Sequence, residues 1–332
     1  MTKKDGAEPK PTVAPFDLRG LKTVPLAERP SKVFHADLGK PLAANATVAD
    51  WLDSLPRQLA GESIRRLVKH LVRVKQENRT CVAALGGHVI KTGCAPYLID
   101  LMQRGVITAV AMNGAAVIHD LELAVAGRTS EDVGPRLIDG SFGMARETAD
   151  LYAHGAKLAC ETGEGLGRSL GAHLSRLDCR YAETSLLIQA YRLNLPCTVH
   201  VAVGTDVVHM HPVTSGAELG EASYTDFRIL TSVVATMAHG LWMNLGCAVV
   251  MPEVFLKAVS IVNNFGHSLD GLVSANLDMI QQYRGRVNVC ERPSDEAVML
   301  TGHHEIMIPL VHAAAAAALA NAENRRPTAK AA

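Results

Sequence analysis

The chain has 332 residues, of which 48% are hydrophobic and 20% are charged, and its formal net charge is zero. This length is enough for one large domain or two small ones with an ample core. Nucleic acids and membrane surfaces attract clustered Lys and Arg, so a zero balance argues against either as the main partner. We therefore expect a small-molecule substrate and no nucleic-acid or membrane partner.

Seven cysteines are present, and no two of them are spaced C-x-x-C. Zinc knuckles and thioredoxin-type redox sites are therefore unsupported. Most of the cysteines stand in apolar runs, which is typical of small core residues and makes a reducing cytoplasm the simplest compartment. The polar first 15 residues lack the apolar core of a secretory signal. Residues 306–319 predict a buried final helix, being too short and alanine-rich for a membrane span.

Residues 1–45 predict an extended or disordered arm, because six prolines interrupt any regular element. Residues 46–320 are predicted to form a single α/β domain, and residues 321–332 a flexible tail. Within the domain, short apolar runs alternate with helical patterns. Strands are predicted at 81–86, 106–112, 197–203, 241–246, 270–276 and 297–302. Helices are predicted at 48–57, 60–76, 95–104, 117–126, 180–193, 225–238, 251–262 and 305–319, with a polar helical insert at 140–175.

The alternation of strands and helices predicts the fold class. Short apolar strands separated by helices of about ten or more residues imply right-handed crossovers and a mostly parallel sheet. The fully apolar run VITAVAM (106–112) fits a sheet that is covered on both faces. We therefore expect an α/β protein with a Rossmann-like, doubly wound sheet. In such sheets the ligand lies beyond the carboxyl ends of the strands.

Glycine and polar residues follow all six predicted strands at these ends. A glycine there lets the backbone approach a ligand closely, and a helix N-terminus offers free N–H groups to a phosphate. One such turn is explained by turn chemistry alone, but six together favour a shared site. The loop GGHVIKTG (86–93) matches neither of the two phosphate-binding glycine motifs. Its Lys91 is either a partner for a pyrophosphate or substrate carboxylate, or a surface lysine.

Two histidine pairs raise the question of a metal site. His209 and His211 form an H-x-H pair, and His303 and His304 are adjacent. On a strand, H-x-H places both rings on one face, as some metal sites require. The first pair follows a turn, however, and few acidic ligands stand nearby. Proton transfer or hydrogen bonding is therefore the favoured role, with a metal site as the alternative. A Ser-His-Asp hydrolase is disfavoured because no G-x-S-x-G motif is present.

The order of these strand-end segments resembles the deoxyhypusine synthase superfamily. Residues 86–93 stand where the family has a T-S-N-L-I-S-S-G loop. NGAAVIHDL (113–121) stands where the family has T-A-G-G-V-E-E-D-L. Its L-T-D-G fits Asp206 and the threonine before it. Its L-G-G-G-V-V is similar to LGCAVV (245–250), and its A-D-A-S-L-V-F-P-L to GHHEIMIPL (302–310). The resemblance covers roughly residues 75–320 and implies NAD binding and a homotetramer.

One feature of that family is missing. The resemblance implies an imine-forming lysine in a W-G-K segment shortly before the last strand. Here no lysine lies between Lys257 and Lys330, and residues 292–296 show no such segment. Imine exchange requires the amine, so deoxyhypusine formation by that route is not expected. Histidines also stand at positions 119 and 303, where the family places acids.

The first half of the chain also resembles the NAD-dependent ornithine cyclodeaminase of the arginine-dihydrolase and archaeal type. Segments of that group read V-V-H-T-G-A-T-P and G-N-A-L-A-V-H-D-I-E, which are similar to HVIKTGCAP (88–96) and NGAAVIHDLELA (113–124). That group oxidises an amine with bound NAD and then loses ammonia, without an imine-forming lysine. The similarity weakens after about residue 130.

We therefore expect a cytoplasmic, homo-oligomeric NAD-binding enzyme of transferase or lyase type that acts on a small amine or amino acid. The alternatives are an ornithine cyclodeaminase-like ammonia lyase, a histidine-metal-dependent lyase or hydrolase, and a catalytically inactive paralogue. The predicted groups for proton transfer or substrate binding are His119, Asp120, His209, His303 and His304. The predicted cofactor-binding residues are Gly86, Gly87, His88, Lys91, Thr92, Gly93, Asn113, Gly114, Asp206, Gly246, Cys247, Ala248 and Asn276.

Overall fold

The computed structural model describes residues 13–324 and divides the chain into two units between Leu38 and Gly39. In the first unit, the described residues form an extended chain with two short 3₁₀ turns, η1 (Leu26–Glu28) and η2 (His35–Asp37). The rest of the predicted arm, residues 1–12, lies outside the described part of the chain.

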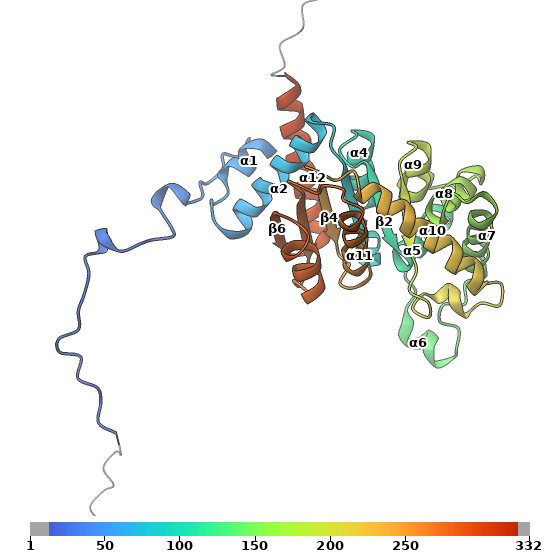
Figure 1. The fold of residues 1–332 in the computed structure, drawn as a ribbon, viewed down its shortest axis with the longest axis horizontal. Helices are drawn as coiled ribbons and strands as arrows, with labels where there is room; N and C mark the ends of the chain where they lie inside the picture. The colour runs from blue at the N-terminus through green and yellow to red at the C-terminus, as the bar shows by residue number, and fades with distance from the viewer. Residues whose placement is uncertain (1–12, 325–332) are drawn as a thin grey trace, which may run out of the picture. The chain divides into compact units, whose positions relative to one another are not determined.

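The second unit is built on one parallel sheet of six strands (Figure 1). All six predicted strands are present: β1 (Cys81–Leu85), β2 (Ala109–Asn113), β3 (Cys197–His200), β4 (Leu241–Leu245), β5 (Val273–Asp278) and β6 (Glu296–Thr301). Their order is β3-β2-β1-β4-β5-β6, and every neighbouring pair is parallel. This is the order of dinucleotide-binding sheets, so the predicted α/β class is confirmed.

Helices connect the strands and cover both faces of the sheet (Figure 1). The α-helices are α1 (Val48–Ser54), α2 (Leu59–Gln76), α3 (Gly87–Lys91), α4 (Ala95–Gln103), α5 (Gly114–Ala126), α6 (Val133–Ile138), α7 (Arg146–Thr162), α8 (Leu166–Arg176), α9 (Leu186–Arg192), α10 (Gly216–Val234), α11 (Val250–Asn264) and α12 (His304–Asn324). Two further 3₁₀ turns are η3 (Ala182–Thr184) and η4 (Val207–Met210), and η5 (Gly285–Glu291) is a π-helix of seven residues.

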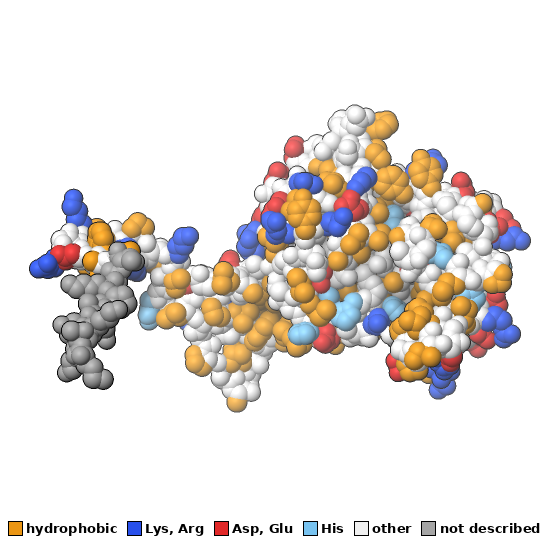
Figure 2. Space-filling view, turned by 90° about the horizontal axis from the view of Figure 1, so that it is seen from below, with side chains coloured by type: hydrophobic (Ala, Val, Ile, Leu, Met, Phe, Trp, Pro, Cys, Tyr) orange, Lys and Arg blue, Asp and Glu red, His pale blue; other side chains and the backbone are white. Residues whose placement is uncertain are grey.

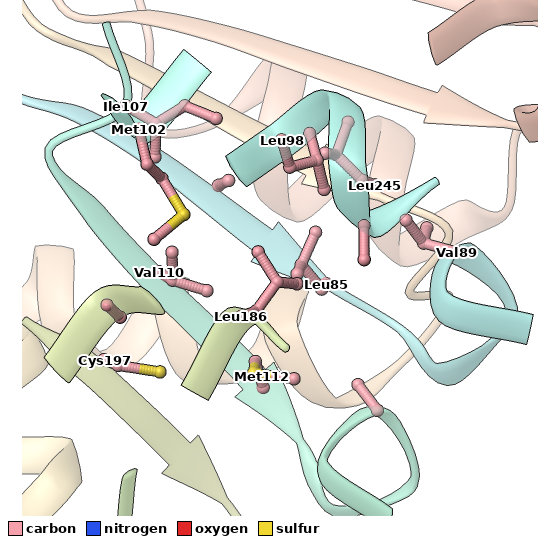
Figure 3. Packing of buried hydrophobic residues seen from close by; sticks show 14 of the residues in the cluster. Leu85, Val89, Leu98, Met102, Ile107, Val110, Met112, Leu186, Cys197 and Leu245 are labelled. Carbon is pink, nitrogen blue, oxygen red and sulfur yellow. The ribbon is translucent and has the colours of Figure 1, made fainter. Parts of the chain in front are cut away.

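Strand residues alternate between two buried clusters, one on each face of the sheet. On one face Leu85, Val110 and Leu245 pack against α4 and α9, which contribute Leu98 and Leu186 (Figure 3). The second cluster lies under α10 and α11 and takes the intervening strand residues. Because both faces are buried, β1 (CVAAL) is a continuous apolar run. In β3 (CTVH) and β5 (VSANLD) polar side chains alternate with apolar ones, and Thr198, Ser274 and Asn276 are buried as well.

The second cluster contains an aromatic pair that offers a test of its packing. Trp242 on β4 stacks on Phe255 of α11, with ring centroids 3.9 Å apart and planes 12° apart. Replacing Phe255 by leucine keeps most of the volume but removes the stack. We expect the free energy of unfolding to fall by about 1.5 kcal/mol, measured by urea denaturation. The control Phe265→Leu, at a ring that is 77% exposed, should change it by less than about 0.5 kcal/mol. Equal losses in the two variants would contradict this packing.

Several predicted boundaries differ from the structure. The polar insert at 140–175 consists of α7 and α8, which are separated by Gly163 and Gly165, both at positive φ. The helix predicted at 225–238 begins earlier, at Gly216, because the Ser215 hydroxyl accepts a hydrogen bond from the Glu218 backbone N–H.

The last helix is longer than the sequence led us to expect. α12 runs to Asn324, so the first residues of the predicted tail are helical. Among the described residues, α12 is the one helix that is long and apolar enough to cross a membrane, over residues 304–322. Only 28% of this apolar stretch is buried. Length and composition alone are weak evidence for a span, since core helices pass the same test. Here Ile308, Val311 and Ala315 pack into the main core.

Candidate functional site

The change in chain direction across the sheet falls between β1 and β4. From β1 the chain moves outward to β2 and β3, then returns to β4 on the other side of β1. Gly86 and Gly87 follow β1 at this point. A Cβ added to Gly86 would lie 2.0 Å from the Gly246 carbonyl oxygen, and one added to Gly87 would lie 3.2 Å from His119 Cδ2. These glycines let strand-end loops contact one another, whereas we had predicted that they admit a ligand.

A pocket of about 780 Å³ opens beside this point. Its walls come from α5, the segment 128–133, the start of α7 and residues 205–207. Ile118, Leu121 and Leu151 give it an apolar base. The titratable groups that line it are Lys91, His119, Glu122, Arg128, Glu131, Glu147 and Asp206. Of the predicted site residues, the structure brings together Lys91, His119 and Asp206.

His119 is held in the pocket by a chain of hydrogen bonds. Its Nδ1 lies 2.7 Å from the Thr129 hydroxyl, which donates to Glu122 Oε2 at 2.5 Å. The other carboxylate oxygen of Glu122 accepts from the Thr148 hydroxyl at 2.9 Å. Burial, together with the nearby Lys91 ammonium, lowers the pKa of His119 to about 4. The imidazole is therefore uncharged at neutral pH and can act as a base.

Asp206 lies against the N-terminus of α5. A Cβ on Gly114 would lie 1.9 Å from Asp206 Oδ2, so only glycine leaves room for the carboxylate. That oxygen is buried and has no hydrogen-bond partner among the described residues. Burial raises the pKa of Asp206. An unpaired buried acceptor at a pocket wall can bind a ligand hydroxyl or amine.

His209 shapes the loop that carries Asp206. Its Nδ1 accepts hydrogen bonds from the backbone N–H groups of Gly204 at 3.1 Å and Asp206 at 3.3 Å. The neighbouring His211 bonds the Gly143 carbonyl oxygen through Nε2, at 2.8 Å. Each ring of the H-x-H pair thus has a loop-organising contact. In residues 13–324 no group of three His, Cys, Asp or Glu is placed to hold a metal ion.

Asp120 has a different position from the one we predicted. Its carboxylate is 1% exposed and accepts hydrogen bonds from the Ser185 hydroxyl and from the backbone N–H groups of Leu186 and Leu187. It therefore caps the N-terminus of α9. Burial raises its pKa to about 6. Because all these contacts are internal, and the pocket lining does not include Asp120, we assign it a structural role.

The histidines after β6 also lie outside the pocket lining. His304 is 1% exposed, its Nε2 bonds the Leu277 carbonyl oxygen at 3.2 Å, and its ring packs against Gly246. His88 lies edge-on to it, with ring centroids 5.4 Å apart. The His303 side chain is 67% exposed. These groups gather at the ends of β4 to β6, on the opposite side of Gly86 from His119.

Other predicted cofactor residues make internal contacts. Asn113 caps α5 through its side-chain oxygen, which accepts from the Ala116 N–H at 2.9 Å. Asn276 is 1% exposed and bonds Asn244 and Gln281. The Thr92 hydroxyl donates to the His88 carbonyl oxygen, and the buried Cys247 sulfur accepts from the Met251 N–H. Ala248 is half-buried just before α11, and a Cβ added to Gly93 would meet no atom within 4 Å.

The sequence analysis missed the residues that hold His119 through hydrogen bonds, Glu122, Thr129 and Thr148, and also the charged lining residues Arg128, Glu131 and Glu147. Glu122 stands three positions after His119, on the same face of α5, and this spacing was the available signal. Thr129 follows the end of α5 and Thr148 belongs to α7, so neither could be placed beside His119 without the fold.

Seen from the side on which α6 lies, histidine side chains reach the surface at several points (Figure 2).

No protein-family model and no curated protein matches the chain, but solved structures do. An LOR/SDH protein from Methanococcus maripaludis S2 superposes with a TM-score of 0.50 at 15% identity, over 80% of this chain and 71% of that one. The complex of AgrE with ornithine and NAD+ gives 0.51 at 14%, over 79% of this chain and 33% of AgrE. A protein named as a deoxyhypusine synthase from Entamoeba histolytica gives 0.50 at 11%, over 82% and 94%.

The chain has the deoxyhypusine synthase-like fold. At these identities the likeness concerns the fold alone, and the chain spans only about a third of AgrE. The resemblance to both groups that the strand-end segments indicated is thereby confirmed for the fold. A shared fold does not fix the chemistry, which depends on the pocket residues.

Proposed function

We propose that this protein is an NAD-binding enzyme that acts on a small amine or amino acid without an imine-forming lysine. The observation that carries the proposal is the pocket itself, which unites an uncharged histidine, an unpaired buried carboxylate and a lysine. These are the groups of His119, Asp206 and Lys91. The pocket lies beyond the carboxyl ends of β2 and β3, on one side of the change in strand order, and doubly wound sheets bind ligands beyond the carboxyl ends of their strands.

The residues of the pocket fit a dinucleotide. The Asp206 carboxylate lines the pocket and can accept a hydrogen bond from a ribose hydroxyl, and Lys91 can pair with the pyrophosphate. AgrE, which shares the fold, has been solved with ornithine and NAD+. When bound, NAD would accept a hydride from the carbon that carries the substrate's amine. The pocket volume of about 780 Å³ lies within the usual range for ligand sites.

The charges of the pocket favour an amine. Four carboxylates (Glu122, Glu131, Glu147 and Asp206) face two permanent cations (Lys91 and Arg128). An ammonium group is attracted to such a site, while its apolar base accommodates an aliphatic chain. His119 would relay to solvent the proton that the amine loses, since an imidazole with a pKa of about 4 is uncharged at neutral pH and does not retain that proton.

The cofactor claim is tested by calorimetry with NAD. We expect the protein to bind NAD and the Asp206→Asn variant to bind it at least about tenfold more weakly, because one charged acceptor is lost. The matched control is Asp178→Asn, at an exposed carboxylate outside the pocket, which should bind as the wild type does. No binding of NAD at millimolar concentration would overturn the proposal and favour an inactive paralogue.

A further inference from the structure

We propose that Glu122 and Thr129 are positioning residues that hold His119 in its Nδ1–H tautomer, so that Nε2 presents its lone pair to the pocket. The use of that lone pair as a base rests on the proposed function. The tautomer itself follows from the geometry of the hydrogen bonds.

A count of hydrogens fixes the direction of these bonds. The Thr129 hydroxyl has one hydrogen and two close partners, Glu122 Oε2 at 2.5 Å and His119 Nδ1 at 2.7 Å. An ionised carboxylate can only accept, so the hydroxyl hydrogen points to Glu122. The oxygen of Thr129 must then accept from Nδ1, which therefore carries the proton.

The second hydroxyl on Glu122 strengthens this assignment. Thr148 is buried and donates to Glu122 Oε1 at 2.9 Å. Both oxygens of the Glu122 carboxylate thus accept a hydrogen bond from a threonine hydroxyl. Glu122 thus remains the acceptor at the end of the chain of hydrogen bonds.

The other ring nitrogen is directed to the pocket. His119 lines the pocket, and its Nε2 makes no hydrogen bond with any residue that the structure describes. Gly87 packs on the ring edge, which limits its rotation. The charged groups facing it are Lys91 from α3, Glu147 from α7, Asp206 before η4, and Arg128 and Glu131 after α5.

This arrangement supplies what proton transfer needs. The unprotonated Nε2 accepts a hydrogen bond from the substrate's ammonium group, while the Nδ1–H stays on Thr129. A proton that passes to Nε2 leaves a neutral amine and an imidazolium, and because the pKa of His119 is about 4, that proton then moves on to solvent. A base oriented by a second group is the logic of catalytic triads, here with a hydroxyl between histidine and carboxylate.

The tautomer can be read directly by ¹⁵N NMR of histidine-labelled full-length protein at neutral pH, with the His119 signals assigned by their loss in His119→Gln. In the wild type we expect Nδ1 to resonate as a protonated nitrogen and Nε2 as an unprotonated one. Thr129→Ser keeps the hydroxyl and should give the same pattern. Thr129→Val removes it, and Glu122→Ala frees it to turn its hydrogen toward Nδ1. Both of these variants should shift the ring to the Nε2–H form.

Two results would overturn the proposal: an Nε2–H ring in the wild type, or an unchanged pattern in Thr129→Val and Glu122→Ala. The measurement needs neither NAD nor substrate, so it fails independently of the proposed function. Adding NAD to the same sample separates the two claims. The expected tautomer without any NAD-induced shift of the His119 signals would support the positioning role and count against the cofactor.

Discussion

An alanine at position 86 is expected to destabilise the protein by about 3 kcal/mol and to abolish ligand binding in the pocket. The added Cβ would lie 2.0 Å from the Gly246 carbonyl oxygen and 2.7 Å from its carbon. Both are backbone atoms, so no side-chain rotation relieves the clash. The loops after β1 and β4 would have to separate, and α3, which carries Lys91 into the pocket, begins at the next residue.

The control for this change is Gly220→Ala. Gly220 is an exposed residue inside α10, and a Cβ there meets nothing within 4 Å. Alanine should stabilise the helix by about 0.5–1 kcal/mol. Urea denaturation of both variants checks the pair. A Gly86→Ala variant as stable as the wild type would show that the two strand-end loops are not in contact.

Replacement of Asp226 by alanine is the second change with a large expected effect. Asp226 on α10 is fully buried, and its Oδ2 accepts from the backbone N–H groups of Val199 at 2.7 Å and Gly167 at 2.9 Å. One carboxylate thus accepts a hydrogen bond from a backbone N–H at the free edge of β3 and another from a backbone N–H in the first turn of α8. Alanine leaves two buried donors without partners, so we expect a loss of about 3 kcal/mol or more in the free energy of unfolding. A loss below about 1 kcal/mol in urea denaturation would contradict this role.

Asp226→Asn is the matched variant, because its amide oxygen can still accept both hydrogen bonds. Burial raises the pKa of Asp226 from 3.8 to about 8. The folded state therefore binds the proton more tightly, and this group's contribution to stability is lost as the pH rises from about 4 to about 8. Asparagine does not titrate. Its stability relative to the wild type should therefore rise between about pH 4 and about pH 8, and a constant difference would show that the carboxyl group is not shifted.

The sheet could be predicted because its strands carry the signal within themselves. The run CVAAL is buried at every position in β1, and LWMNL in β4, so each appears in the sequence as an uninterrupted core segment. Helix starts were harder to predict, because they depend on local caps. α10 begins nine residues before its predicted start, where the Ser215 hydroxyl accepts from the Glu218 N–H.

The pocket could be predicted only in part. Lys91, His119 and Asp206 follow different strands, and a parallel sheet brings such residues to one edge. Glu122 was overlooked, because its function depends on hydroxyls that reach it from two other segments. Asp120 was misjudged for the same reason, since nothing local predicts that α9 begins against it. In a single sequence, a buried carboxylate that caps a helix cannot be distinguished from one that meets a ligand.

A crystal structure of the protein with NAD tests the central claim most directly. We expect NAD in the pocket between α5 and residues 128–133, with a ribose hydroxyl on the Asp206 carboxylate and the nicotinamide ring facing His119 Nε2. NAD bound instead near His88 and His304, at the ends of β4 to β6, would contradict it, as would a pocket that remains empty at saturating NAD.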